Sequence, residues 1–365
     1  MKNKTKNYVT VILLGLLMFA LALVCWFKSP TAFSDSERRA LAQLPDLGIK
    51  EILNGSFMKN FETYTQDQFP LRDSFRTVKS FAALNIFNLK DTNGLFTEDG
   101  YVAKTEYPLS EDMLKNAAEK FDFIKEKFLS EEDSTYLCIV PEKNYYMDSH
   151  LYLDLDELSD FMAENTPWLE QIDIRDALTL DNYYRTDSHW KQETIIPVAK
   201  SLAEKLGISI TDDYTVNTLE RPFTGVYAEQ IALPFEADTI KYLTNEVLEN
   251  VTVTSYDTGM PVQTSVYDME GAMGKDAYDI YLGGADPLIV IENPNASSDR
   301  ELILFRDSFS SSLTPLLVEG YAKITMVDIR YVQSAFLGSL VDFEGAQDVL
   351  FIYSASMLNS STAFK

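Results

Sequence analysis

The stretch Glu301–Ser312, which reads ELILFRDSFSSS, decides the fold. Its apolar run Leu302–Phe305 is too dense for a strand with one face in solvent, and it is typical of a strand buried on both faces of a parallel sheet. The turn Asp307-Ser308 follows, and a Ser-rich segment then leads into an expected helix over Leu313–Tyr321. A buried strand, a sharp turn that carries a serine, and a helix are how several hydrolase folds present a nucleophile. Ser308 is therefore a candidate nucleophile at the carboxyl edge of a sheet.

The segments around this stretch predict an α/β domain. In chain order we expect a helix over Glu111–Phe128 and a strand over Tyr136–Val140, then, after Ser308, strand Ile324–Asp328, short helix Val332–Leu340 and strand Val349–Tyr353. Alternating helices and buried strands predict a three-layer α/β/α domain with a mostly parallel central sheet.

The pattern changes between about residues 208 and 295. Thr, Tyr and Val alternate there, and turn signals stand at Asp257-Thr258-Gly259 and Gly283-Gly284. Such a pattern is typical of β-hairpins rather than of parallel strands. We therefore expect a β-rich insertion over about residues 208–295.

The N-terminus carries an apolar run, Tyr8–Phe27, of twenty residues without a charge. At about 1.5 Å per residue this run just spans the hydrocarbon core of a bilayer. Lysines precede it, which predicts a cytoplasmic N-terminus and an exported remainder. Ala20-Leu21-Ala22 resembles a signal-peptidase site but lies inside the run, so an uncleaved anchor is favoured over a cleaved signal. We expect an anchor over residues 1–30 and an extracytoplasmic domain over 31–365.

Composition excludes several classes of function. The net charge of −25 argues against nucleic-acid binding, which needs a basic patch. Cys25 and Cys138 offer no disulfide framework within the domain. The two histidines, His150 and His189, exclude a His-rich zinc site, although a carboxylate-held metal stays open. We expect neither a metal nor a cofactor, and we expect His150 at the surface.

The most distinctive polar cluster is DNYYRTDSHWKQE, residues 181–193, which precedes an expected helix over Thr194–Leu206. Acyl transfer through a serine needs a base and a group that holds the base in the correct tautomer. Asp187 and His189, two residues apart on an extended loop, point the same way and can supply both. The alternative is structural: His189 packs beside Trp190, Asp187 caps the helix, and Asp-Ser at 307–308 is itself a helix cap.

Three further residues stand at expected strand ends. Lys143, Arg330 and Tyr331 are candidates to line a substrate pocket, and each can equally be structural.

Asp187-Ser188-His189-Trp190 resembles the D-x-H-W signature of the DHHW proteins of Gram-positive bacteria. These are similar to the alginate O-acetylation proteins AlgX and AlgJ, which belong to the SGNH hydrolase-like group. Further blocks carry the resemblance in the same order: FSDSERRALAQLP, GSFMKNFETYTQDQFPLRDSF, IVPEKNYY, YLGGADPLIVIENP, LFRDSFSSSLTPLL and MVDIRYV. The resemblance implies an SGNH hydrolase-like fold and a triad of Asp187, His189 and Ser308. This sequence departs from the pattern at Arg306, where the family has glycine, and at Ser188.

The resemblance also implies a function. We expect a membrane-anchored, extracytoplasmic O-acetyltransferase or esterase that acts on a cell-envelope or exopolysaccharide glycan. A membrane-bound O-acyltransferase is the partner that the resemblance suggests. The alternative is a non-catalytic carbohydrate-binding or scaffold protein of a polysaccharide modification system, with exposed aromatic residues as sugar-stacking platforms.

Overall fold

The computed structural model describes residues 2–34, 36–37, 39–149, 152–296 and 298–365, so His150 lies outside the described residues. The chain forms two compact units. The N-terminal unit contains Met1–Asn93 and Ala228–Pro234, and the sheet unit contains Gly94–Tyr227 and Phe235–Lys365. The expected boundary near residue 30, between an anchor and an exported domain, stays a prediction.

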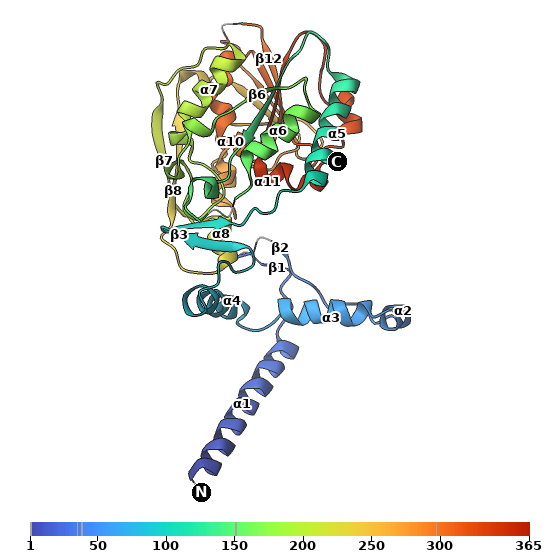
Figure 1. The fold of residues 1–365 in the computed structure, drawn as a ribbon, viewed down its shortest axis with the longest axis vertical. Helices are drawn as coiled ribbons and strands as arrows, with labels where there is room; N and C mark the ends of the chain where they lie inside the picture. The colour runs from blue at the N-terminus through green and yellow to red at the C-terminus, as the bar shows by residue number, and fades with distance from the viewer. Residues whose placement is uncertain (1, 35, 38, 150–151, 297) are drawn as a thin grey trace. The chain divides into compact units, whose positions relative to one another are not determined.

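The sheet unit is built on an eight-stranded sheet with the order β10-β9-β11-β13-β12-β14-β5-β6 (Figure 1). Strands β13, β12, β14, β5 and β6 are parallel to one another, while β11, β9 and β10 extend the sheet beyond β13 in antiparallel pairing. The strands span β5 Ser134–Val140, β6 Glu170–Ile172, β9 Thr252–Ser255, β10 Val262–Thr264, β11 Leu288–Glu292, β12 Glu301–Arg306, β13 Lys323–Val327 and β14 Asp348–Ser354. The prediction of a mixed α/β fold with a mostly parallel sheet is confirmed.

The central strand β12 shows why the sheet is covered on both faces. Leu302 and Leu304 belong to one hydrophobic core, and Ile303 and Phe305 belong to another. Successive side chains of a strand point to opposite faces, so each core covers one face of the sheet. Helix α7 (Ile196–Leu206) contributes to the first core, and helices α5 (Glu111–Phe128) and α6 (Leu155–Asn165) contribute to the second, on the other side of the sheet (Figure 1).

The segment from 208 to 295 is rich in antiparallel strands. Strand β7 (Thr215–Phe223) pairs with β8 (Asp238–Thr244) in a separate two-stranded sheet. Strands β9, β10 and β11 join the central sheet instead. The central sheet is therefore wider than its parallel strands alone, and the insertion as a unit stays a prediction.

The α-helix expected over Leu313–Tyr321 is wrong in position and length: the helix after Ser308 lies earlier and is shorter. Helix α10 covers only Phe309–Leu313, and two 3₁₀ turns, Thr314–Leu316 and Val318–Gly320, follow it. The reason is Pro315: proline has no N–H to donate, so it cannot continue the α-helical hydrogen bonds. The helix expected over Val332–Leu340 is likewise a 3₁₀ segment, Ser334–Ser339.

The remaining elements of the sheet unit are short. Strand β3 (Leu95–Glu98) pairs with β4 (Tyr101–Lys104) in an antiparallel hairpin. Helices α9 (Glu246–Glu249) and α11 (Ala355–Leu358) complete the set. Helix α8 (Val226–Ile231) begins in the sheet unit, and its residues from Ala228 on belong to the N-terminal unit.

The N-terminal unit begins with one long apolar helix. Helix α1 spans Lys2–Phe27, and its part Lys4–Phe27 contains a strongly apolar window of 18 residues, none of which is buried. By length and composition it can cross a membrane. The other elements are β1 (Phe33–Ser34), β2 (Arg39–Ala40), α2 (Ile49–Leu53), α3 (Ser56–Asp67), and α4 (Arg72–Phe81), which continues as a π-helical turn over Ala82–Ile86.

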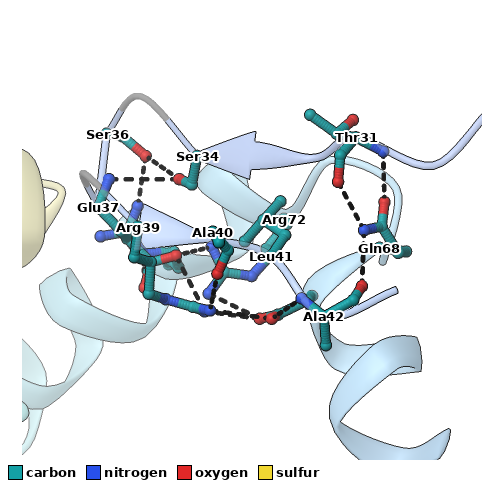
Figure 2. A network of polar contacts seen from close by, with 12 residues as sticks. Thr31, Ser34, Ser36, Glu37, Arg39, Ala40, Leu41, Ala42, Gln68 and Arg72 are labelled. Atoms are coloured by element: carbon teal, nitrogen blue, oxygen red, sulfur yellow. Dashed lines mark hydrogen bonds and ion pairs between the residues drawn. The ribbon is translucent and has the colours of Figure 1, made fainter. Parts of the chain in front are cut away.

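A polar network ties the chain after α1 to the end of α3, as Figure 2 shows. Gln68 accepts the Thr31 N–H at 2.8 Å and donates to the Thr31 and Ala42 carbonyls. Asp67 accepts hydrogen bonds from Nη2 and Nη1 of Arg39, at 2.6 and 2.9 Å, and from the Ala42 N–H. The Arg39 hydrogen bonds, which outweigh burial, lower the pKa of Asp67 to about 2.

Candidate active site

The structure brings Ser308, His189 and Asp187 together at the carboxyl edge of the sheet. His189 Nε2 lies 2.7 Å from Ser308 Oγ, and His189 Nδ1 lies 2.6 Å from Asp187 Oδ1. Ser308 is half-buried, the His189 side chain is 13% exposed and the Asp187 side chain 1% exposed. The three groups have the order and spacing of a nucleophile, a base and an orienting carboxylate.

Ser308 comes to this position because β12 ends at Arg306 and the chain turns at once into α10. Asp307, rather than Ser308, satisfies the turn: its Oδ1 accepts the Phe309 N–H at 3.0 Å and its Oδ2 accepts the Ser354 N–H at 2.7 Å. Ser308 makes no side-chain cap to α10. The hydroxyl of Ser308 is therefore left to His189.

Asp187 is held by hydrogen bonds to both of its carboxylate oxygens. Oδ1 accepts the N–H of His189 at 3.1 Å in addition to the imidazole, and Oδ2 accepts the N–H of Val226 at 2.8 Å. Neither oxygen caps α7, which begins at Ile196 without a side-chain cap. The alternative in which Asp187 caps the helix that follows it, α7, is thus not what the structure has.

The segment Gly225–Val226 lies very close to Asp187. A β-carbon on Gly225 would stand within 2.6 Å of Asp187 Oδ2, so only glycine fits there. The Gly225 N–H donates to Thr186 Oγ1 at 2.9 Å, and Thr186 in turn donates its N–H and hydroxyl to Asp238. Backbone from a distant segment therefore packs directly on the Asp187 loop.

Two aromatic residues contact the imidazole of His189. It stacks on Tyr278 with 4.0 Å between ring centroids and 12° between planes, and Phe309 lies on it at 5.1 Å. Tyr278 is fixed by a 2.8 Å hydrogen bond to Ser312 Oγ, which also accepts from Trp190 Nε1. These contacts fix the plane of the ring that faces Ser308.

The electrostatics favour a basic imidazole. Burial tends to lower the pKa of His189, but the charge and hydrogen bond of Asp187 outweigh it and raise the pKa above its usual 6.5. Burial would raise the pKa of Asp187, yet His189 and the two backbone N–H donors hold it well below its ordinary value. Asp187 is therefore ionised, and His189 is a stronger base than free imidazole.

Lys143 lies beneath the Asp187 loop rather than in an open pocket. Its side chain is 1% exposed as a residue, and its Nζ donates to the carbonyls of Tyr184, Arg185 and Asp187 at 2.9, 3.2 and 2.6 Å. Burial lowers the pKa of Lys143 to about 7. These contacts give Lys143 a positioning role, and substrate binding by it stays a prediction.

Arg330 and Tyr331 follow β13, at the same edge of the sheet as Ser308. Arg330 forms a two-point ion pair with the buried Asp328, and its guanidinium lies over the Tyr331 ring at 5.5 Å. Tyr331 is 48% exposed. Their contact with a substrate stays a prediction.

Arg306 occupies the position where the DHHW resemblance has glycine. It takes ordinary strand geometry, and its buried guanidinium donates to Ser311 Oγ and to the carbonyls of Gly284 and Asp286. Burial lowers its pKa. The side chain thus joins α10, through Ser311, to the loop at Gly284–Asp286.

Sequence reasoning missed the residues that support the triad. Trp190 lies inside the predicted polar cluster, so its contact with Ser312 could have been anticipated. Gly225, Val226 and Tyr278 carry no local signal, because their role depends on contacts with residues 38 to 89 positions away along the chain. Among the described residues, no group of three His, Cys, Asp or Glu side chains could hold a metal ion.

No protein-family model matches the chain, and no curated protein matches it either. Solved structures are similar to it. A DHHW family protein from Eubacterium siraeum is 23% identical over 75% of this chain and 94% of its own, with a TM-score of 0.61. Bacillus cereus PatB1, solved with a sulfonyl adduct, is 21% identical over 72% of this chain and 95% of its own, with a TM-score of 0.57.

The O-acetyltransferase domain of Pseudomonas putida AlgJ follows at 13% identity and a TM-score of 0.45, a likeness too weak to carry an argument. At these identities the comparisons speak for the fold alone. The expected resemblance to DHHW proteins is therefore confirmed as a likeness of fold over about three quarters of the chain.

Proposed function

We propose that the protein is a serine acyltransferase or esterase whose nucleophile is Ser308. The observation that carries the proposal is the 2.7 Å contact between Ser308 Oγ and His189 Nε2, with His189 Nδ1 held at 2.6 Å by Asp187. A serine, a base and a carboxylate in this order activate a hydroxyl for attack on a carbonyl.

These contacts define which atoms give and accept the proton at each step of the proposed reaction. Asp187 accepts the Nδ1 proton, so Nε2 carries the lone pair and takes the Ser308 proton as Oγ attacks the ester carbonyl. The imidazolium gives that proton to the leaving alcohol, and an acyl-serine remains. An incoming hydroxyl then loses its proton to Nε2 and attacks the acyl-serine, which restores Ser308.

The developing oxyanion needs donors near Ser308. Among the described residues, the Ser308 N–H donates to no protein acceptor. This backbone donor lies at the attacking residue itself, where an oxyanion would form, and we assign it as one part of the oxyanion site.

The substrate and the location rest on the resemblance and on α1. We propose that α1 is an uncleaved anchor and that the sheet unit acts outside the membrane on a glycan of the cell envelope or an exopolysaccharide. Acetyl transfer to a sugar hydroxyl is the proposed outcome, with a membrane-bound O-acyltransferase as the donor partner. An orienting site can favour the sugar over water, since effective molarities reach about 10⁵–10⁸ M.

The test of the nucleophile is labelling of the full chain by a serine-directed sulfonyl fluoride or fluorophosphonate. Wild-type protein and Ser339→Ala, which removes an exposed serine of the sheet unit, should be labelled equally. Ser308→Ala should not be labelled, and its melting temperature should stay close to that of the wild type. Labelling that persists in Ser308→Ala would move the nucleophile elsewhere.

A second assay separates transfer from the alternatives. Full-length protein is incubated with a chromogenic acetyl ester and with candidate glycan oligomers. Acetylated oligomer in mass spectra, together with faster ester consumption, supports transfer, whereas release of acetate from a pre-acetylated glycan alone supports an esterase. Tight glycan binding without either activity, unchanged in Ser308→Ala, would favour the carbohydrate-binding scaffold instead.

A further inference from the structure

Exposed apolar residues are concentrated in the N-terminal unit. Among the described residues between 28 and 93, fourteen large apolar side chains are exposed, against ten among those described between 94 and 365, a segment four times as long. Twelve of the fourteen form two groups, one at and before α2 and one along α4 and the turn after it: Leu44, Leu47, Ile49, Ile52 and Leu53, and Leu71, Phe75, Val78, Phe81, Ile86, Phe87 and Leu89. Scattered apolar residues are ordinary on a soluble surface, but two such groups are not.

Helix α4 is amphipathic with its apolar side outward. Leu71, Phe75 and Val78 recur at helical spacing on one face and are 68, 49 and 64% exposed. The other face packs inside the N-terminal unit, where Arg76 donates to the carbonyls of Glu229 and Gln230. A helix of a soluble domain buries its apolar face, so α4 is built for an apolar medium on its open side.

A groove of about 750 Å³ lies between α1 and the α3–α4 region, and its surface is largely apolar. The α1 side is formed by the last third of the apolar helix, which includes Met18, Leu21 and Trp26. The opposite side includes Phe69 and Phe75, with Arg72, Arg76 and Lys79 among the lining residues. Helix α4 therefore faces the part of α1 that would lie in one leaflet of a membrane.

Charge separates the two parts of the chain. Residues 28–93 contain nine Lys or Arg and eight Asp or Glu, and residues 1–27 contain three lysines and no acid. The net charge of −25 therefore arises within residues 94–365. An anionic lipid surface repels such an acidic segment but not the N-terminal unit.

We propose that α2 and α4 lie on the bilayer, in the leaflet at the C-terminal end of α1, with their exposed apolar side chains at the boundary between headgroups and acyl chains. Lipid fills the groove between α1 and α4. The N-terminal unit is then attached to the membrane by its spanning helix and by a second, interfacial surface. This attachment does not depend on the chemistry at Ser308.

The polar network of Thr31, Asp67 and Gln68, which joins the chain after α1 to the end of α3, supports this arrangement. Only a few residues separate Phe27 from Thr31, and Thr31 is bonded to Gln68 at the end of α3. The start of α4 at Arg72 follows four residues later. The exit of α1 and the start of α4 are thus joined by short, hydrogen-bonded chain, which keeps α4 near the membrane surface.

The test measures the membrane depth of α4 in the full chain. Cys25→Ser removes the half-buried thiol, while Cys138 is buried and unreactive towards a bulky label. Val78→Cys in that background carries a bimane label, and Val216→Cys, 55% exposed in the sheet unit, is the matched control. Both proteins are reconstituted into phosphatidylcholine–phosphatidylglycerol vesicles, and retention after a carbonate wash reports whether α1 is inserted.

The expected result is a difference between the two labels. Lipids brominated close to the headgroup should lower the bimane emission at position 78 by about twofold, because interfacial helices are buried about 5–10 Å deep. Aqueous iodide should quench the label at position 216 and spare the one at 78. Equal iodide quenching at both positions, in protein that is retained on the vesicles, would overturn the proposal.

Two further outcomes also decide against it. A label at position 78 that neither iodide nor brominated lipid quenches is covered by protein, so a second copy of the chain occupies α4.

Phe75→Asp with Val78→Asp should raise iodide access at a label on Phe81→Cys, whereas Val216→Asp with Met260→Asp should not. If both double variants behave alike, α4 has no lipid contact.

Discussion

Gly225 lies directly against Asp187, with no room for a side chain between them. A β-carbon at this position would stand 2.6 Å from Asp187 Oδ2 and closer still to the Asp187 backbone. The carboxylate that orients His189 is therefore held in place by the main chain of a segment 38 residues further on. This contact makes the geometry of the triad depend on a residue that takes no part in the chemistry.

Gly225→Ala should displace Asp187 and lower the rate of acetyl-ester turnover by about 100-fold, since misplacement of a catalytic group by about 1 Å can cost that much. Gly15→Ala is the matched control, because an added methyl there meets nothing within 4 Å. Turnover and melting temperature should be measured together. Full activity in Gly225→Ala would show that the loop yields without cost.

Asp187→Asn should leave the fold intact and reduce turnover roughly 10⁴-fold, as expected when the wrong imidazole tautomer is fixed. The amide can still accept from Val226, so the loop keeps its main hydrogen bond. Steady-state kinetics on a chromogenic ester provide the measurement. A loss smaller than tenfold would remove Asp187 from the triad.

The rate of Ser308 labelling should fall as the pH drops through the pKa of His189, because only the neutral imidazole accepts the serine proton. That pKa is raised above 6.5 by Asp187, so the acid limb lies above this value. In Asp187→Asn the raising effect is lost while burial remains, and the acid limb should move to lower pH. An acid limb at the same pH in both proteins would contradict the assignment.

Lys143→Met should lower both stability and turnover, because it leaves the Tyr184 and Asp187 carbonyls buried without a donor. Each such group costs about 1–3 kcal/mol. Lys205→Met, at an exposed lysine, is the control and should change neither quantity. Equal melting temperatures for the two variants would mean that Lys143 does not hold the loop.

The same lysine predicts a pH dependence of stability. Its pKa is about 7 in the folded protein and about 10.4 when unfolded, so the unfolded state binds more protons between these values. The Lys143 contribution to stability therefore rises with pH from 7 to 10. Between pH 7 and 10, the melting temperature should rise more steeply with pH for the wild type than for Lys143→Met.

Asp67→Asn should weaken the polar network that joins the chain after α1 to the end of α3. The folded pKa of Asp67 is about 2, below its ordinary value, so the stabilisation by Arg39 is present above about pH 4 and is lost as the pH falls towards 2. Hydrogen exchange of residues 39–42 should be faster in Asp67→Asn than in wild type at pH 6, with the difference shrinking below pH 4. Asp73→Asn, at an exposed carboxylate, is the control.

The sequence carried enough to predict the strands that position the site. The runs at Leu302–Phe305 and Val349–Tyr353 are apolar at every position, because a hydrophobic core covers each face of the sheet at these two paired strands. The same dense pattern has no counterpart in β9 and β10, which lie at the antiparallel side of the sheet and bury few residues. Their membership of the central sheet was therefore not predictable from periodicity.

The candidate site was predictable in part for a similar reason. Asp187 and His189 are neighbours in the chain, so their pairing follows from local geometry, and Ser308 follows from its strand. Gly225 and Tyr278 act on them across the fold, and a single sequence contains no period or spacing that links such residues. Arg306 likewise gave no sign that its side chain would brace α10.

His189 and Ser308, the proposed base and nucleophile, stand 119 residues apart along the chain. An unfolded or half-folded chain therefore carries at position 308 only an ordinary alcohol, since closing so long a loop requires the whole sheet between them. If Ser308 is the nucleophile, as we propose, its reactivity appears only when folding is complete. A serine-directed reagent would then count native molecules in a refolding reaction, and a newly made chain would be protected from its own chemistry until it is finished.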